Sequence, residues 1–320
     1  MYPDVSSNSH FGDVYFNSVH IADHDPNTTS FDNTSRLLQE YQVKKGKECV
    51  DKDEPLFRVT AVTAGNNQTP SLFVMSLSHT LGDGFTFYSI YSMFEKSPYA
   101  MIVEREKDFA EQSKAVLGNE QFQFLSSPGF IIGAVANLAS SAPPIVIEEI
   151  DLEIVKKVKE EAAKEGGVDF VSTNDVVTSE YLANCGLSYG MMAINMRGKV
   201  ACVGEKHAGN YMGSLVLTDD QFRTPASLRT ALKTLHQTAV PTFWQACLGR
   251  NAVASNWASF HHELVLPGNL SPLDHHPLQR DIVHMVWTTG IIYKPTADKL
   301  ALLYGKVQPQ IKLGISKGSN

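Results

Sequence analysis

A histidine and an aspartate four residues apart carry the strongest chemical signal in the sequence. His79 is followed by Asp83 and Gly84 in the run Ser-His-Thr-Leu-Gly-Asp-Gly. Histidine is the side chain whose ordinary pKa lies closest to neutral, so an imidazole can take up and release a proton at physiological pH. We therefore interpret His79 as a candidate general base.

The residues around His79 predict a strand, a tight turn and a helix. The apolar run of residues 72–78 predicts a buried strand that delivers His79 at its end. Gly82 and Gly84 permit backbone angles that residues with a Cβ avoid, so they predict a tight turn between strand and helix. Apolar residues at helical spacing follow over residues 85–94. A rigid strand end can hold an imidazole at the edge of a cleft, where a base meets its substrate.

The carboxylate of Asp83 has two possible roles. It could accept a hydrogen bond from the imidazole of His79, or it could turn away and pair with an arginine that fixes the turn. We favour the second role, because a general base needs an open face toward its substrate. The competing explanation is that His79 is a hydrogen-bonded structural histidine and that the glycines only serve the turn.

The spacing of His79, Asp83 and Gly84 resembles the shared signature of the chloramphenicol-acetyltransferase-like acyltransferases, which is a histidine, three residues and then Asp-Gly. This superfamily includes the BAHD enzymes of plants, the nonribosomal condensation domains and the wax-ester synthases. Further segments resemble strands and a helix of the family, at residues 54–60, 172–178, 192–199 and 255–257. The resemblance implies an α/β fold with mixed sheets (α+β), built as two lobes with a channel between them.

The resemblance also implies supporting roles for residues outside the motif. In the family an arginine from the strand that Arg197 ends pairs with the aspartate of the motif, which is Asp83 here. A buried carboxylate needs such a partner, because leaving it unpaired costs about 3–5 kcal/mol; the alternative is that Arg197 is a surface residue. Ser255 or Trp257 could shape the channel, and the serine hydroxyl could donate to the oxyanion of a tetrahedral intermediate. Simple packing of an amphipathic strand is the alternative for this pair.

The sequence departs from the family in two respects. The Asp-Phe-Gly-Trp-Gly signature of the plant enzymes is absent, and His275-His276-Pro277 lies in the region where it is expected. The chain is also short for the family, so we expect most of the usual N-terminal strand and helix to be missing. We place a shortened N-terminal lobe at residues 1–142 and a C-terminal lobe at residues 143–320, with the boundary in a Ser-Ser-Ala-Pro-Pro stretch.

The resemblance implies acyl transfer from an acyl thioester, with acyl-coenzyme A as the expected cosubstrate, to a hydroxyl or amine acceptor. His79 would take the proton from the acceptor while that atom attacks the thioester carbonyl, and would then protonate the leaving thiolate. No permanently bound cofactor and no covalent acyl-enzyme are needed. Two alternatives stay open: a noncatalytic binding or assembly subunit on the same scaffold, and hydrolysis of a thioester by water through the same histidine.

Composition indicates an ordinary soluble globular protein and narrows the range of partners. Of 320 residues, 43% are hydrophobic and 19% are charged, which suffices for one large or two modest domains. The formal net charge of −7 and the dispersed lysines and arginines argue against nucleic-acid binding. The longest apolar stretch, residues 130–139, is shorter than the ~20 residues of a membrane-spanning helix. It predicts a buried helix or a lid, and contact with a membrane surface is the less favoured alternative.

The cysteines and paired histidines predict no metal site. Four cysteines are widely spaced without a Cys-x-x-Cys pair, so we expect reduced thiols in a reducing compartment such as the cytoplasm, with a plastid or other organelle also open. His261-His262 and His275-His276 are adjacent pairs, and neighbours on a strand point to opposite faces, so neither pair chelates a metal by itself. The first residues are neither basic nor apolar enough for a targeting segment.

Further helices and strands are expected in the second half of the sequence. Apolar residues at helical spacing predict a helix that begins near Leu152 and that Gly166-Gly167 terminates. Thr173 is the expected N-cap of the next helix. Strands are expected near residues 253–260, 283–288 and 300–305.

Overall fold

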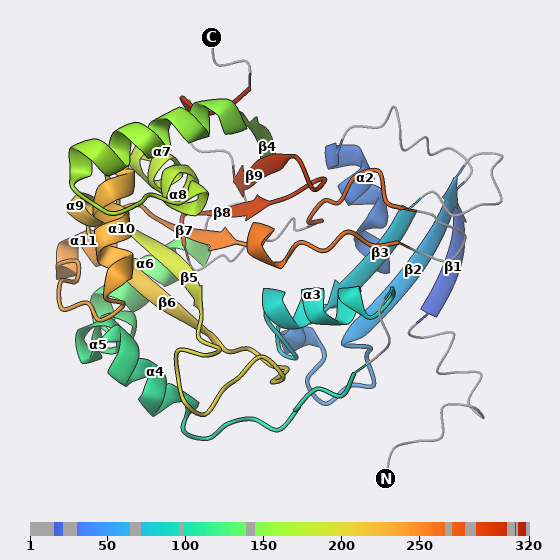
Figure 1. Ribbon diagram of the computed structural model, residues 1–320. Helices are drawn as coiled ribbons and strands as arrows, with labels where there is room; N and C mark the ends of the chain where they lie inside the picture. Colours follow the sequence, from blue (N-terminus) through green and yellow to red (C-terminus); the bar gives the residue numbers. More distant parts are fainter. Residues whose placement is uncertain are drawn as a thin grey trace. The chain divides into compact units, whose positions relative to one another are not determined.

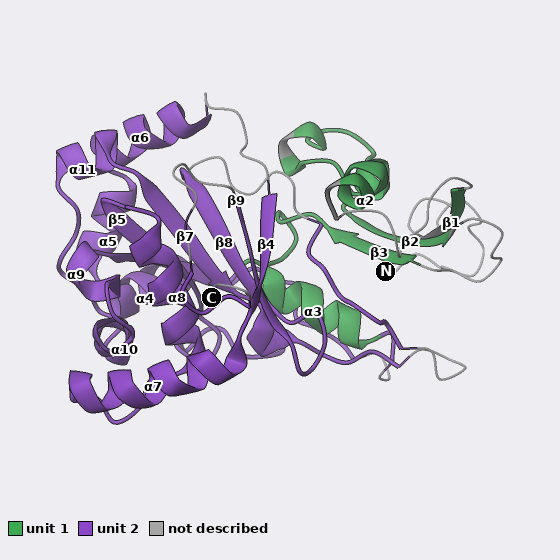
Figure 2. Ribbon diagram, turned by 90° about the horizontal axis from the view of Figure 1, so that it is seen from above, with its two compact units in different colours: residues 1–93, 208–210 green, residues 94–207, 211–320 purple. Residues whose placement is uncertain are grey.

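The structure is a computed structural model that describes residues 16–21, 31–64, 72–95, 99–138, 145–265, 271–278, 286–305, 311 and 313–317. The chain divides into two compact units (Figure 2). The first unit comprises residues 1–93 with Ala208–Asn210, and the second unit comprises residues 94–207 with 211–320. The lobe boundary expected between residues 142 and 143 falls outside the described residues and stays a prediction.

The first unit contains a three-stranded sheet in the order β1-β2-β3 (Figure 1). Its strands are β1 (Phe16–Ile21), β2 (Phe57–Ala64) and β3 (Leu72–Leu77). β1 runs parallel to β2, and β2 runs antiparallel to β3. The helices are α2 (Phe31–Leu37), the 3-10 helices η2 (Leu38–Tyr41) and η3 (Gly46–Glu48), and α3 (Gly84–Ser92). The predicted strand before His79 and the predicted helix after it are therefore confirmed.

The second unit contains a six-stranded sheet in the order β4-β9-β8-β7-β5-β6. Its strands are β4 (Ile145–Ile150), β5 (Tyr189–Asn195), β6 (Met212–Leu217), β7 (Asn251–Asn256), β8 (Thr288–Tyr293) and β9 (Leu300–Gly305). β7 runs parallel to β5 and β8, and the other neighbouring strands are antiparallel. The predicted α/β class with mixed sheets is confirmed. The strand expected at residues 283–288 is misplaced, because β8 begins only at Thr288 and residues 283–285 lie outside the described chain.

Helices cover both faces of the six-stranded sheet and form two hydrophobic cores with it. The helices are α4 (Phe109–Leu117), α5 (Asn119–Leu125), α6 (Pro128–Leu138), α7 (Leu152–Gly166), α8 (Thr173–Asn184), α9 (Asp219–Phe222), α10 (Pro225–Lys233) and α11 (Phe243–Leu248). Side chains of a strand alternate between its faces, so neighbours on β5 enter different cores. Met192 packs in the core with residues of α7, α8 and α10, whereas Met191 packs in the core with residues of α5, α6 and α11.

Local sequence signals set the ends of the two longest helices. Asp151 caps α7, where its carboxylate accepts hydrogen bonds from two backbone N–H groups at 2.9 and 3.1 Å. α7 ends where the sequence predicts, and Gly167 follows it with a left-handed φ of 62°. The N-cap of α8 is Ser172 instead of Thr173, because the Ser172 side chain forms a capping box with Asp175.

Helix α6 includes residues 130–138 of the longest apolar stretch and is only partly buried. It carries no charged residue. Four of its apolar side chains are 48–59% exposed, at Ile131, Ile132, Val135 and Leu138. On its other side α11 approaches closely, and a Cβ on Gly133 would lie 2.3 Å from the carbonyl oxygen of Ala246. Within the described residues no helix has both the length and the apolar character needed to cross a bilayer. Contact with a membrane surface stays the less favoured alternative.

We expect the packing of α8 on β8 to tolerate no side chain at Gly290. A Cβ there would lie 2.6 Å from Cε1 of Tyr181, whose ring is fully buried. Gly290→Ala should therefore lower the free energy of unfolding by about 1–3 kcal/mol through overpacking. Gly204→Ala is the matched control, because the nearest atom to its new Cβ would be 4.0 Å away, and its effect should stay within about 0.5 kcal/mol. Urea unfolding followed by tryptophan fluorescence measures both, and equal stabilities of the two variants would contradict the expectation.

Candidate active site

His79 lies just beyond the end of β3 and is exposed to solvent. The backbone of Ser78 continues the strand pairing, since its N–H donates to the carbonyl of Leu56 at 2.7 Å. A turn follows, closed by the N–H of Leu81, which donates to the carbonyl of Ser78 at 2.9 Å. The imidazole is thus carried by a hydrogen-bonded turn on a sheet strand, and solvent reaches it, as a general base requires.

Asp83 caps the helix that follows the turn. It is the N-cap of α3, and its Oδ1 accepts a hydrogen bond from the backbone N–H of Thr86 at 3.0 Å. The same oxygen lies 3.1 Å from the hydroxyl of Thr86. The residue is buried, with 6% of its surface exposed. A carboxylate at this place is stabilised by the unpaired N–H groups and the positive end of the helix dipole. Oδ1 therefore serves the helix terminus.

The two glycines beside Asp83 do not have the backbone angles that the sequence predicted. Neither Gly82 nor Gly84 has a positive φ, and Gly84 is already the first residue of α3, so the expectation of unusual backbone angles was wrong. A Cβ on Gly82 would instead lie 2.6 Å from Cγ2 of Thr86. Gly82 therefore makes room for the Thr86 side chain against the turn.

A segment from far along the sequence binds to this helix terminus. The hydroxyl of Thr86 lies 3.0 Å from the carbonyl oxygen of Gly209 and accepts the Gly209 N–H at 3.0 Å. The backbone N–H of Asp83 also donates to the Gly209 carbonyl, at 3.2 Å. Gly209 has a φ of 146°, a value that residues with a Cβ rarely adopt. The motif residues thus hold the segment Ala208–Asn210 in place.

Asn210 brings its side-chain amide to the candidate base. Its Nδ2 lies 3.3 Å from Nδ1 of His79. Sequence reasoning missed this residue, because it lies 131 positions from His79 in a loop between strands that shows no periodic pattern. The side-chain amide of Asn210 therefore lies beside the imidazole of His79.

Arg197 lies in the loop that follows β5 and is buried, with 6% of its surface exposed. The alternative of a surface arginine is therefore wrong. Its Nε donates to the carbonyl of His207 at 3.0 Å, and its Nη1 donates to Oδ1 of Asn195 at 3.2 Å. The guanidinium carbon also lies 5.2 Å from the centre of the Tyr211 ring. Its pairing with Asp83 stays a prediction.

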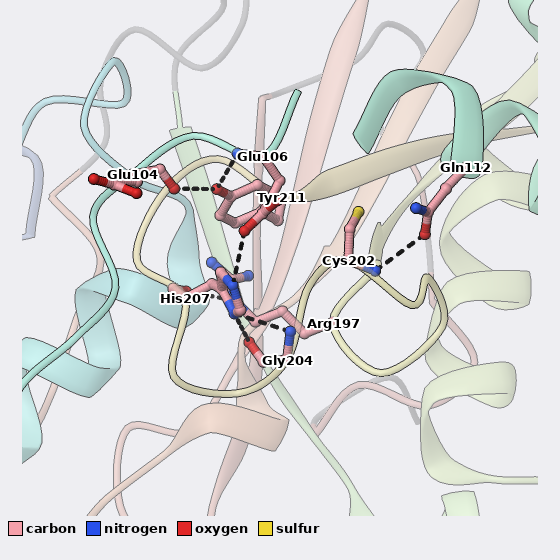
Figure 3. A network of polar contacts seen from close by, with 8 residues as sticks. All are labelled: Glu104, Glu106, Gln112, Arg197, Cys202, Gly204, His207 and Tyr211. Atoms are coloured by element: carbon pink, nitrogen blue, oxygen red, sulfur yellow. Dashed lines mark hydrogen bonds and ion pairs between the residues drawn. The ribbon is translucent and has the colours of Figure 1, made fainter. Parts of the chain in front are cut away.

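The loop between β5 and β6 is pinned by a network of polar contacts (Figure 3). Nε2 of His207 lies 3.3 Å from Oε1 of Glu106, and its Nδ1 accepts the N–H of Gly204 at 3.0 Å. The hydroxyl of Tyr211 donates to the carbonyl of Glu104 and accepts the N–H of Glu106, both at 3.2 Å. The loop is therefore fixed on both sides of the segment Ala208–Asn210.

Ser255 and Trp257 lie at the end of β7 and contact each other. The indole Nε1–H of Trp257 donates to Oγ of Ser255 at 3.0 Å. The backbone N–H of Trp257 donates to the carbonyl of Ile292 at 2.8 Å, which extends the pairing of β7 with β8. Because Oγ accepts from the indole, the Ser255 hydroxyl still has a proton to donate. A role of either residue in a channel or an oxyanion hole stays a prediction.

The histidines of the two adjacent pairs make different contacts. Nε2 of His262 lies 2.7 Å from Oε2 of Glu95, whereas the ring of His261 lies 6.3 Å from that of His275, centre to centre. Burial lowers the pKa of His275 to about 4, and the nearby His261 adds to the effect. Burial also lowers the pKa values of His261 and His276. Within the described residues no three side chains of ligand type gather as a metal site.

All four cysteines are free thiols, as predicted. Cys185 is buried, and Cys49, Cys202 and Cys247 are partly buried. Burial raises the pKa of Cys185 to about 12, so this thiol stays protonated and unreactive at neutral pH.

Solved structures resemble this fold, whereas no protein-family model and no curated protein sequence matches the chain. TRI101 of F. graminearum, complexed with coenzyme A and deoxynivalenol, matches with a TM-score of 0.57 and 12% identity over 90% of this chain and 76% of that chain. TRI101 of F. sporotrichioides, complexed with coenzyme A and T-2, matches with a TM-score of 0.50 and 12% identity over 90% and 76%. The first condensation domain of the calcium-dependent antibiotic synthetase, in complex with a substrate analogue, matches with a TM-score of 0.51 and 11% identity over 93% and 70%. The predicted resemblance to chloramphenicol-acetyltransferase-like proteins is thereby confirmed for the fold.

The lowered pKa of His275 predicts a loss of stability in mild acid. The folded state keeps this imidazole neutral down to about pH 4, whereas the unfolded chain binds the proton from about pH 6.5, so stability falls as the pH drops through this window. We expect the loss to amount to about 2 kcal/mol, after allowance for partial exposure of the side chain. His275→Gln cannot take up the proton, so its stability should fall less between pH 6.5 and 4, in urea unfolding at several pH values. His236→Gln, an exposed control, should follow the parent; parallel curves for all three proteins would contradict the expectation.

Proposed function

We propose that the protein is an acyltransferase that moves an acyl group from an acyl thioester, such as acyl-coenzyme A, to a hydroxyl or amine, with His79 as the general base. The observation that carries the proposal is the solvent-exposed imidazole just beyond the end of β3, one turn before the N-terminus of α3. The fold supports it, because TRI101, whose solved structure has a similar fold, is complexed with coenzyme A and deoxynivalenol. The fold alone does not determine the reaction, so the reaction is inferred from the residues of the site.

The proposed reaction needs one proton acceptor that also returns the proton. His79 removes the proton from the acceptor oxygen or nitrogen as that atom forms a bond to the thioester carbonyl carbon. The tetrahedral intermediate then breaks its carbon–sulfur bond, and the imidazolium gives the proton to the leaving thiolate. Acceptor and thioester thus become acylated acceptor and free thiol, with no covalent enzyme intermediate and no permanently bound cofactor.

The surrounding residues have supporting roles in this proposal. The carboxylate of Asp83 accepts hydrogen bonds at the α3 terminus, which leaves the imidazole as the group that exchanges protons with the substrate. The Ser255 hydroxyl accepts the Trp257 indole N–H and keeps its own proton, and we assign it as a donor to the oxyanion of the intermediate. We assign to the guanidinium of Arg197 the role of compensating the negative charge of the Asp83 carboxylate.

His79→Ala should abolish acyl transfer and leave the fold intact, because the side chain is exposed at a turn. Loss of a general base costs about 10²–10⁴-fold in rate. The measurement incubates the protein with a panel of acyl thioesters and a cell extract, and follows acylated products by mass spectrometry. His236→Ala is the matched control, since it removes another exposed imidazole.

Three outcomes of this experiment separate the candidate functions. Transfer that depends on His79 and not on His236 supports the proposal. Release of free acid in place of an acylated product would mean that water is the acceptor and that the protein is a thioester hydrolase. A folded parent protein that binds thioesters or extract components without turning them over would favour the noncatalytic binding or assembly subunit.

The proposed pair of Asp83 and Arg197 is tested by a double-mutant cycle. Asp83→Ala and Arg197→Ala should each lower the free energy of unfolding by about 3 kcal/mol, because both side chains are buried and charged. If the two charges pair, the double variant should lose less than the sum of the single losses, by about 1–3 kcal/mol. Urea unfolding of the four proteins measures this coupling. Additive losses would remove the pair and leave each residue only with its own hydrogen bonds.

A further inference from the structure

We propose that Asn210 is a positioning residue for His79, whose side-chain carbonyl accepts the Nδ1–H of the imidazole and keeps Nε2 free to act as the base. The inference rests on the proposed function of His79 and adds a residue to it. Within the described part of the chain, the amide of Asn210 is the hydrogen-bond partner of this ring, at 3.3 Å from Nδ1. A histidine ring on an exposed turn needs such a partner, because otherwise it can rotate and exchange its two tautomers.

The protonation state follows from the reaction that His79 is proposed to perform. A neutral imidazole carries its proton on one nitrogen and accepts on the other. A base acting at Nε2 therefore requires the proton on Nδ1, and a hydrogen bond at Nδ1 must go to an acceptor. Once Nε2 has taken the substrate's proton, both ring nitrogens carry protons, and the same acceptor then stabilises the imidazolium.

The amide of Asn210 can supply this acceptor from where it stands. In the structure its Nδ2 end faces Nδ1 of His79. Oxygen and NH2 of an amide occupy nearly the same volume, so a half-turn of the terminal group presents Oδ1 at the same place. We assign this second orientation to the working enzyme, since the Nδ2 end would donate to Nδ1 and put the proton on Nε2.

The backbone that carries Asn210 is held by the motif. The preceding residue, Gly209, exchanges hydrogen bonds with the Thr86 hydroxyl at 3.0 Å in each direction and accepts the N–H of Asp83 at 3.2 Å. Thr86 is in turn fixed by the carboxylate of Asp83. The aspartate of the motif therefore reaches the histidine indirectly, through Thr86, Gly209 and Asn210.

Two nearly isosteric substitutions distinguish the roles of the amide. Asn210→Asp keeps an acceptor oxygen and loses the NH2 donor, whereas Asn210→Leu keeps the shape and loses both. We expect Asn210→Leu to lower kcat for acyl transfer about 10- to 100-fold with little change in KM, as for a misplaced catalytic group. Asn210→Asp should retain kcat within about 10-fold of the parent. Asn184→Leu, which changes an exposed asparagine on α8, should match the parent in both constants.

A spectroscopic readout tests the tautomer without any need for activity. In ¹⁵N NMR of the histidine rings, assigned with His79→Ala, the parent and Asn210→Asp should show His79 protonated on Nδ1. Asn210→Leu should show a mixture of tautomers. A parent ring protonated on Nε2, a tautomer unchanged in Asn210→Leu, or loss of kcat in Asn210→Asp equal to that in Asn210→Leu would overturn the inference.

The two proposals fail in different measurements. If His79→Ala keeps full transfer activity, the proposed function of His79 is wrong whatever the NMR spectra show. If His79→Ala is inactive while Asn210→Leu leaves tautomer and kcat unchanged, the base is right and the role of Asn210 is wrong.

Discussion

The candidate site depends on the hydrogen bonds that the hydroxyl of Thr86 makes. It connects residues that are 123 positions apart in the sequence, and it is buried between the carboxylate of Asp83 and the backbone of Gly209. A hydroxyl has a single proton, so it donates to one of these two acceptors at a time while it accepts the Gly209 N–H. Leaving such a buried group without partners would cost about 1–3 kcal/mol. The geometry of the turn, the helix terminus and the distant segment is therefore one mutually dependent arrangement.

This arrangement gives a physical reason for the spacing of the motif. The strand ends, one turn follows, and the helix begins at the residue after Asp83, so the aspartate occurs where a helix needs an N-cap. The residue before it must be small because Thr86 fills the space where a Cβ would lie. The histidine takes no part in these contacts, which is consistent with a group that is free to meet a substrate. Motif residues other than the histidine thus build its surroundings.

The sequence was informative where short-range rules apply. The strand before His79, the helix after it and the termination of α7 at Gly167 follow from apolar periodicity and from glycine conformation. The start of β8 was misplaced, because residues 286 and 287 are apolar and look like the strand itself, although pairing begins only at Thr288. Asn210 and Gly209 could not be predicted, since contacts between a loop and a distant helix terminus leave no period in the sequence. Burial of Arg197 followed from the resemblance and from the cost of an unpaired carboxylate, and not from any local pattern.

Arg197 has a second route of influence on the site, through the loop that it holds. Its Nε donates to the carbonyl of His207, the residue directly before the segment Ala208–Asn210. On the other side of the segment, Tyr211 is fixed by hydrogen bonds to the backbone of Glu104 and Glu106. A three-residue segment anchored at both ends has few conformations left, so the loop limits the backbone conformations that Asn210 can adopt. An arginine here consequently holds the backbone of His207 and the side chain of Asn195 together. A lysine, with one point charge and no planar fork, could not make these two hydrogen bonds in the same geometry.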